Sequence, residues 1–290
     1  MSAHTGRARR GFSLIELIIT LVLVSIIGVA AGRLLMSQTR FYTRLSGQRD
    51  ARSVTRGARN IIQTELSMVE AGGGVTAASN SSLTVRVPYA WGVYCSASTM
   101  MRLPVDAAMY SMATLAGYAI RDTMNTTTGA YTYTATTTAP TTGGTTATDC
   151  MTTAGITAPT DGAYLSLSPA VSFPTPAANY GPGSPMFLYQ TITYSFAASA
   201  LVPGKLGLFR SVGGGTPEEL LAPFDATAQF YYYSLNTATA SVTVPALTDI
   251  RGVELHLNAQ SPNRASNRAE PESASITTSI FFRNRMRTDS

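Results

Sequence analysis

The feature that most constrains this chain is an unbroken apolar run over residues 12–32, in which Glu16 is the only charged residue. As a helix the run is roughly 30 Å long, which matches the hydrocarbon thickness of a bilayer. A basic segment precedes it and contains His4, Arg7, Arg9 and Arg10. Because an ionised carboxylate is costly inside a bilayer, Glu16 is predicted to have a function there.

The start of the run carries the motif Arg10-Gly11-Phe12-Ser13-Leu14-Ile15-Glu16. It resembles the prepilin processing site of type IV pilins and type II secretion pseudopilins. The resemblance implies that a prepilin peptidase cuts after Gly11, removes the leader 1–11 and N-methylates Phe12. It also implies that Glu16, the fifth mature residue, neutralises the terminal amine of a neighbouring subunit during assembly. Buried charges persist only when they are paired, which gives this pairing a physical reason.

Two other export signals fit parts of the same segment. Val29-Ala30-Ala31 has the small residues of a secretory signal that is cut after Ala31. The pair Arg9-Arg10 is similar to the start of a twin-arginine signal. Neither signal gains anything from a carboxylate at Glu16, and the run is long for a removable signal. Prepilin processing is therefore the favoured prediction.

The positive charge of the chain is concentrated near the N-terminus. Charged residues make up only 13% of the chain, and the formal net charge is +5. Seven arginines follow the apolar run: Arg33, Arg40, Arg44, Arg49, Arg52, Arg56 and Arg59. Within this stretch only Asp50 opposes them. Such a stretch suits lipid phosphates, an acidic neighbour or nucleic acid. Nucleic acid is the least favoured partner, because no aromatic interleaving or groove-reading motif accompanies the arginines.

The motif predicts the orientation of the apolar run, and the compartment that it implies predicts the state of the two cysteines. Basic residues flank both ends of the apolar run, so charge alone does not fix its orientation. The motif predicts a single-pass inner-membrane protein with a cytoplasmic N-terminus, which later enters the periplasm or a cell-surface pilus. Cys95 and Cys150 are the only cysteines, and both lie beyond the run. In an oxidising periplasm we predict one disulfide between them, with two buried free thiols as the alternative.

The helical pattern extends over residues 12–71, where Gly72-Gly73-Gly74 predicts a stop. Its lower apolar face contains Leu34, Leu35, Phe41, Tyr42 and Leu45. Its upper apolar face is rotated by roughly 150° and contains Ala51, Val54, Ala58, Ile61, Ile62, Leu66 and Val69. We predict that the upper half packs on the chain's own head, while the lower half meets lipid and other subunits. A kink at Gly47 is the alternative.

Residues 75–290 are predicted to form one β-rich head. Residues 83–87 alternate apolar and polar side chains and are expected to end as a strand at Pro88. Further strands are predicted over residues 186–196, 205–212, 228–235, 249–259 and 274–282. Residues 125–160 are rich in Thr, Ala and Gly and lack large aliphatic side chains, which predicts a solvated insertion. The expected fold class is α+β, a type IV pilin-like fold with a long helix packed on an antiparallel sheet.

The order of motifs in the second half of the chain resembles the PilW-like minor pilins and the J-type minor pseudopilins. The motifs are Leu208-Phe209-Arg210, Gly213-Gly214-Gly215, Glu219-Leu220-Leu221 and Phe230-Tyr231-Tyr232-Tyr233, followed by Ile250-Arg251-Gly252-Val253-Glu254-Leu255 and Ile280-Phe281-Phe282-Arg283. This resemblance implies a minor pilin, with a minor pseudopilin of type II secretion as the close alternative. A membrane-anchored or secreted adhesin that never joins a filament is the alternative from another class.

No constellation typical of an enzyme is found in the sequence. His256 is the only histidine beyond the leader, and its place on the polar face of a predicted strand favours a solvated side chain. The glycine triplets lack the Lys-Ser/Thr of a phosphate loop. Asp122 with Asn125, or Asp149 with Asp161, offer oxygen ligands but lack calcium-loop spacing. We therefore expect no catalytic activity, cofactor or metal. The expected partners are prepilin peptidase, other pilin subunits, the pilus assembly machinery and the inner membrane.

Overall fold

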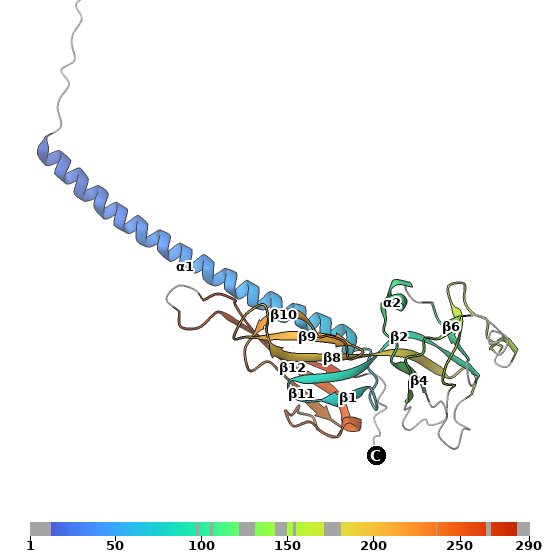
Figure 1. The fold of residues 1–290 in the computed structure, drawn as a ribbon. Coiled ribbons are helices and arrows are strands. Elements are labelled where there is room, and N and C mark those ends of the chain that lie inside the picture. The colour runs from blue at the N-terminus through green and yellow to red at the C-terminus, as the bar shows by residue number, and fades with distance from the viewer. Residues whose placement is uncertain are drawn as a thin grey trace, which may run out of the picture.

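The computed structural model describes residues 13–96, 99–104, 107–121, 131–142, 150–152, 155–170, 181–235, 237–264 and 268–282. Within them, one long helix, α1 (Leu14–Leu66), precedes a head made almost entirely of antiparallel strands (Figure 1). The fold class is α+β, as the sequence predicts: a long apolar helix followed by a large antiparallel sheet. The leader 1–11 and Phe12 lie outside the described residues.

The head contains thirteen strands within the described residues. They are β1 (Val75–Ala78), β2 (Ser82–Ser96), β3 (Thr99–Arg102), β4 (Gly117–Arg121), β5 (Tyr131–Ala135), β6 (Thr141–Thr142), β7 (Ala163–Ser166), β8 (Pro185–Ala198), β9 (Leu206–Val212), β10 (Glu218–Phe224), β11 (Gln229–Ser234), β12 (Ile250–Gln260) and β13 (Ser273–Phe281). A short helix, α2 (Ala107–Met112), precedes β4, and a 3-10 turn, η2 (Leu247–Asp249), precedes β12. The main path of the sheet is β11-β12-β10-β9-β8-β2-β3-β7-β6, with β1 on β2, β13 on β12, and β4 between β5 and β8.

The upper half of α1 packs on the sheet, as predicted. Its buried residues recur every three or four positions and therefore share one face: Gly47, Ala51, Thr55, Ala58, Ile62 and Leu66. They join one apolar core with alternate residues of β12, namely Val253, Leu255 and Leu257. The N-terminal part of the helix, in which no described residue before Gly47 is buried, projects beyond the head (Figure 1). The predicted burial is wrong for one residue of this face: Ile61 is 36% exposed, at the margin of the contact.

The helix ends earlier than predicted, at Leu66 rather than near Ala71. Ser67 is the C-cap, and the chain then turns through Val69 and Glu70, which are both buried. Gly72 and Gly73 have φ values of 78° and 95°, a region that glycine enters without steric cost. The glycines therefore form the turn into β1 and do not cap the helix directly.

Two long strands, β2 and β8, run through both halves of the head and pair along most of their length. Their register shifts between Pro88 and Ala90, so that Tyr89 is an extra residue in β2. The buried positions change accordingly, from Leu83, Val85 and Val87 before the shift to Ala90 and Tyr94 after it. The prediction that this strand ends at Pro88 is wrong. A β-bulge accommodates a proline inside a sheet and turns the strand towards a second core.

The second core corrects the prediction of a solvated Thr-rich insertion. Residues 131–135 of that tract form β5, which pairs with β4. Tyr131 is 8% exposed, and its ring centroid lies 4.8 Å from that of Phe187. Tyr133 contacts Tyr189 edge to face at 5.6 Å. The tract lacks aliphatic residues, but its tyrosines supply the apolar surface that the prediction did not count. Residues 125–130, 143–149 and 153–154 of the tract lie outside the described residues.

Cys95 and Cys150 form a disulfide whose Cα atoms are 4.7 Å apart. Cys95 lies near the end of β2, and both cysteines are fully buried. They pack with Met101, Val93 and Tyr164. The bridge spans 55 positions of sequence, so it restricts a long segment that includes much of the Thr-rich tract.

A side-chain group fixes the upper end of α1 to the sheet. Arg210 of β9 donates to both carboxylate oxygens of Glu65, at 2.7 Å from Nη2 and 3.3 Å from Nε. The hydroxyl of Tyr194 in β8 donates to the same carboxylate. Burial and the neighbouring carboxylate raise the pKa of Tyr194, so it remains a donor at ordinary pH. Bidentate geometry makes this one of the stronger kinds of ion pair.

Replacing Arg210 with Met should lower the free energy of unfolding by about 1–3 kcal/mol, because Glu65 then loses its cation in a partly buried place. The measurement is urea unfolding of the full chain in detergent, followed by circular dichroism. Arg264→Met is the control, since Arg264 is exposed and, among the described residues, donates a hydrogen bond to the backbone carbonyl of Ala269 and forms no ion pair. Equal stability of the two variants would contradict a fixing role for the Glu65–Arg210 pair.

The double variant Cys95→Ala/Cys150→Ala should lower the free energy of unfolding of the second core, which contains β3 to β7, by about 2–4 kcal/mol. We expect faster proteolysis between residues 117 and 166, and the same acceleration when the wild-type chain is treated with dithiothreitol. Dithiothreitol should not change the rate for the double variant. Reaction of both cysteines with a thiol label in the absence of reductant would show that the bridge does not form.

Candidate functional site

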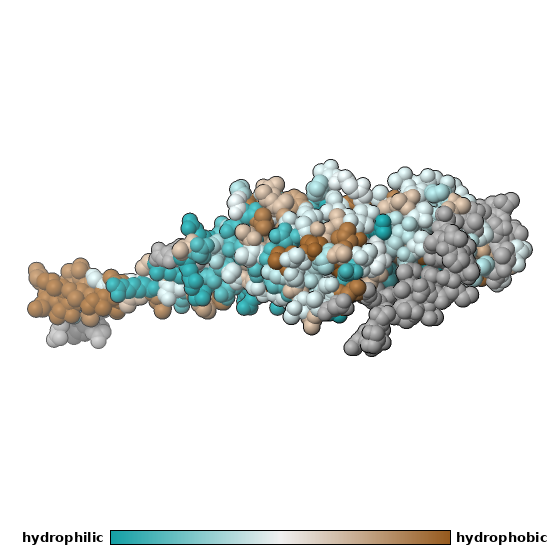
Figure 2. All heavy atoms as spheres, turned by 90° about the horizontal axis from the view of Figure 1, so that it is seen from below, coloured by the Kyte–Doolittle hydropathy of each residue, from teal (hydrophilic) through white to brown (hydrophobic). Residues whose placement is uncertain are grey.

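The lower half of α1 is an exposed apolar rod. Most of its large apolar side chains are at least half exposed, among them Leu14, Ile15, Leu21, Val24, Ile27 and Val29, whereas Leu45 of the predicted lower face is partly buried. Of the helices described, α1 is the one long and apolar enough to cross a membrane. Figure 2 shows this end of the molecule as a continuous hydrophobic surface followed by a hydrophilic one. A surface of this size requires lipid or protein to cover it.

Glu16 lies in the first turn of this helix. Ser13 is the N-cap, and the Glu16 backbone N–H donates to the Ser13 carbonyl at 3.0 Å. The carboxylate is therefore close to the positive end of the helix dipole, which favours negative charge. Gly11 and Phe12 lie outside the described residues, so cleavage, methylation and the pairing of Glu16 with a neighbour's amine remain predictions.

Residues 6–32 match the family described as the prokaryotic N-terminal methylation motif. The chain thus has a prepilin-like N-terminus. Because the matched residues include the first part of α1, the apolar helix that could cross a membrane, the match supports a prepilin-like protein, of the pilin or pseudopilin kind, that is anchored in a membrane. It implies processing by prepilin peptidase and assembly with other pilins. No curated protein and no solved structure matches the chain.

The prepilin-like stem enters the head at Gly47. A Cβ added to Gly47 would lie 3.0 Å from Oγ of Ser261, a contact that few side chains tolerate. The helix continues unbroken through this position from Leu14 to Leu66. Gly47 therefore allows close approach of helix and sheet. The helical hydrogen bonding is continuous there, and a kink at Gly47 stays an alternative prediction. Small residues every fourth position, such as Gly47 and Ala51, are the signal in the sequence for such a contact.

A buried carboxylate marks the same junction, and sequence reasoning missed it. Glu272 at the start of β13 is only 7% exposed. Its Oε1 lies 3.4 Å from Nε of Arg44 and 3.8 Å from Nε of Arg268. Its Oε2 accepts a hydrogen bond from Gln48 at 3.3 Å. Glu272 therefore holds the stem through Arg44 and Gln48 of α1. The sequence around Glu272 contains no pattern that predicts this contact.

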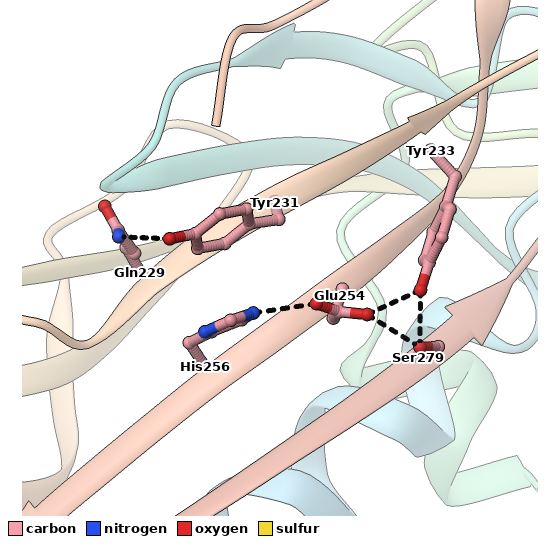
Figure 3. A network of polar contacts seen from close by, with 6 residues as sticks. All are labelled: Gln229, Tyr231, Tyr233, Glu254, His256 and Ser279. Atoms are coloured by element: carbon pink, nitrogen blue, oxygen red, sulfur yellow. Dashed lines mark hydrogen bonds and ion pairs between the residues drawn. The ribbon is translucent and has the colours of Figure 1, made fainter. Parts of the chain in front are cut away.

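His256 belongs to a polar network on the outer face of β11, β12 and β13 (Figure 3). Its Nε2 lies 2.7 Å from Oε1 of Glu254, and its ring stacks on Tyr231 with centroids 4.0 Å apart. Tyr233 donates to Oε2 of Glu254, and Ser279 donates to the same oxygen at 3.2 Å. His256 thus lies on the polar face, as predicted, but it is only partly solvated, because neighbours on the wet face cover part of the ring.

This network does not have the arrangement of a catalytic triad. The hydroxyl of Ser279 bonds the carboxylate of Glu254 and not the ring of His256, so no base is placed to accept its proton. Burial would raise the pKa of Glu254, but the hydrogen bonds from Tyr233, His256 and Ser279 outweigh it and lower that pKa. The bond to Glu254 raises the pKa of Tyr233. These directions are those of a network that holds three strands together.

No metal centre is formed by the part of the chain that the structure describes, since it contains no group of three or more His, Cys, Asp or Glu side chains. Of the oxygen ligands considered from the sequence, Asp161 is described and exposed. Asp122, Asn125 and Asp149 lie outside the described residues, as does His4. The described cysteines, Cys95 and Cys150, are bonded to each other.

The Glu254 network predicts a pH dependence of stability. Its folded pKa is lowered, so its contribution is complete above the unfolded value of about 4.3 and is lost as the pH falls through the lower folded value. The difference in unfolding free energy between wild type and Glu254→Gln should shrink as the pH falls from about 5 towards 3. Urea unfolding at each pH measures it, with the exposed Glu218→Gln as control. A difference that grows on acidification would contradict the assignment.

Proposed function

We propose that this chain is a minor pilin, a low-copy structural subunit of a type IV pilus that takes part in filament assembly or initiation. The observation that carries the proposal is the methylation motif at the start of a long helix, whose first part is apolar and of membrane length and whose upper half is covered by the head. The proposed action is mechanical and not catalytic, and it requires no cofactor.

The proposed mechanism has three steps. The prepilin inserts into the inner membrane through α1, and prepilin peptidase then cuts after Gly11 and methylates Phe12. The subunit next leaves the bilayer and enters the filament, where neighbouring stems replace lipid around the exposed side chains of residues 14–45. Glu16 pairs with the terminal amine of a neighbour at this stage, since a charge that leaves water must be paired.

A place at or near the filament tip fits the shape of the head. The region containing β4, β6 and α2 lies at the end of the molecule furthest from the start of α1 (Figure 1). Laterally repeated subunits have less room for such an extension than a terminal subunit has. The motifs shared with PilW-like and J-type proteins also lie together: Leu208-Phe209-Arg210 is in β9, Glu219-Leu220-Leu221 is in β10, and the two strands pair.

Two other functions stay open as proposals. A minor pseudopilin of a type II secretion system would use the same stem and the same processing, and its periplasmic filament makes the same physical demands. An anchored or secreted adhesin is less favoured, because the exposed lower face over residues 34–45 extends beyond the membrane-length run and needs a protein neighbour. Nucleic acid is not a proposed partner.

Mass spectrometry of membrane and sheared-surface fractions tests the processing step. We expect a mature chain that begins with N-methylated Phe12. A terminus at Gly32, or an intact leader, would reject a prepilin and favour the exported adhesin.

Glu16→Leu tests the assembly step. The variant should insert in the membrane and be cut, but should incorporate into filaments poorly, because the neighbour's amine is left unpaired. Thr20→Leu, one turn further along the same apolar run, is the matched control and should incorporate normally. Incorporation of the two variants at the same level would count against the role of Glu16. Immunoblots of sheared filaments against the membrane pool give the ratio.

A further inference from the structure

Four arginines of α1 form a basic stripe: Arg49, Arg52, Arg56 and Arg59. We propose that the basic stripe is the docking surface for a different pilin-like subunit whose stem carries carboxylates at the corresponding height. This inference rests on the proposed function, because it names the kind of neighbour that the stem selects. It is carried by the direction, exposure and missing counter-charges of the stripe.

The basic stripe points away from the chain's own head. At 100° per residue, its four members fall within an arc of roughly 80° and span roughly 15 Å of helix. All four are exposed, whereas Ala51 and Ala58, between them in sequence, are fully buried. The side chains therefore remain available to a neighbour after the head has packed on the helix.

The basic stripe also continues the exposed apolar face of the lower stem. By the same geometry, the face that contains Leu34, Phe41 and Tyr42 is centred within roughly 20° of the centre of the stripe. These three side chains are 61%, 60% and 69% exposed. A neighbouring helix that packs along the apolar face would next meet the arginines. The partner is therefore a helix with an apolar lower segment followed by an acidic one.

The basic stripe lacks counter-charges of its own. Among the described residues, none of its four arginines is in an ion pair; Arg59 donates to the neutral Gln63 at 3.2 Å. Asp50 lies roughly 140° round the helix from the centre of the stripe. By contrast, Arg44 and Arg210 are paired with Glu272 and Glu65. Like charges on one helical face repel one another, so an acidic neighbour is favoured over none.

Lipid and nucleic acid fit the basic stripe less well. Arg49 lies roughly 25 Å beyond Gly32 along the helix, which is more than two Debye lengths at physiological salt, about 8 Å each. Headgroup phosphates at the end of the apolar run are therefore too far away. No aromatic residue occurs between Arg49 and Arg59 on which a base could stack.

A second copy of the chain is also excluded as the neighbour at this surface. Its stem would bring an identical basic stripe and like-charge repulsion. Three of its carboxylates are already occupied: Glu65 of α1 by Arg210 and, in the head, Glu254 by His256 and Glu272 by Arg44. Between Arg49 and Arg59 its stem offers Asp50 alone, so another chain is the better source of the negative charge. This specificity would place the protein at a position where a different subunit adjoins it, and would keep it from forming the filament alone.

Photocrosslinking of the full chain in cells that form the filament tests the identity of the neighbour. The probe is p-benzoylphenylalanine in place of Ser53, which lines the same shallow groove as Arg49, Arg52 and Arg56. Thr277 on the exposed side of β13 is the control position. We expect a Ser53 adduct whose crosslinked peptide belongs to the N-terminal helix of another prepilin-like chain and has a net negative charge. An adduct with a second copy, lipid or nucleic acid, or no Ser53-specific adduct in filaments, would overturn the proposal.

Charge reversal separates this proposal from the function on which it rests. Arg52→Glu/Arg56→Glu should lower the amount in sheared filaments by about tenfold or more, and Arg52→Lys/Arg56→Lys should stay within about twofold. Arginine in place of the crosslinked partner's acidic residues should restore incorporation of the reversed variant. If the reversed variant incorporated normally while Glu16→Leu stayed out of the filaments, the docking role of the basic stripe would be rejected. The proposed minor-pilin function would be unaffected. A wild-type chain without N-methylated Phe12 would overturn both.

Discussion

The close approach of α1 to the sheet, between Gly47 and Leu66, is the contact on which the rest of the structure depends. Small side chains at Gly47, Ala51 and Ala58 let the helix axis come near β12 and β13, and Ile62 and Leu66 then fill the core. Each fully buried Ile or Leu contributes about 1.5–3 kcal/mol. Two ion pairs fix the position of the helix along the sheet. Glu65 pairs with Arg210 near the upper end of this contact, and Arg44 pairs with Glu272 at its lower end. The stem is thereby a rigid extension of the head.

This contact also decides what remains for other molecules. The sheet covers one side of the upper helix, and the opposite side keeps its arginines exposed. The head does not cover the lower helix, so its exposed apolar residues require lipid or neighbouring stems to cover them. In the proposed function the same helix is an internal core element throughout, and serves first as a membrane segment and then as a docking surface. The prepilin-like N-terminus is consistent with such a stem, because prepilins are inserted in a membrane before they are assembled.

The second half of the head shows where sequence patterns were insufficient. The alternation in β12, with Val253 and Leu255 inside and Glu254 outside, matches the prediction from the sequence. The continuation of β2 past Pro88 does not, because the bulge at Tyr89 depends on pairing with β8, which is about a hundred positions away. Tyr131 and Tyr133 were assigned to a solvated tract, since their burial depends on Phe187 and Tyr189. Local composition carries no information about partners so distant in sequence.

The sequence by itself determined the long apolar helix, its processing motif, the all-antiparallel character of the head and the two faces of the stem. These features are local, because they follow from periodicity, from hydrophobic length and from a short motif. Only the tertiary structure decided the end of α1 at Leu66, the burial of Glu272 and the partners of His256. It also decided which side of the arginine-rich stretch stays open. Each of these depends on side chains brought together from separate strands, and their energies depend on burial and distance, which the order of residues alone does not specify.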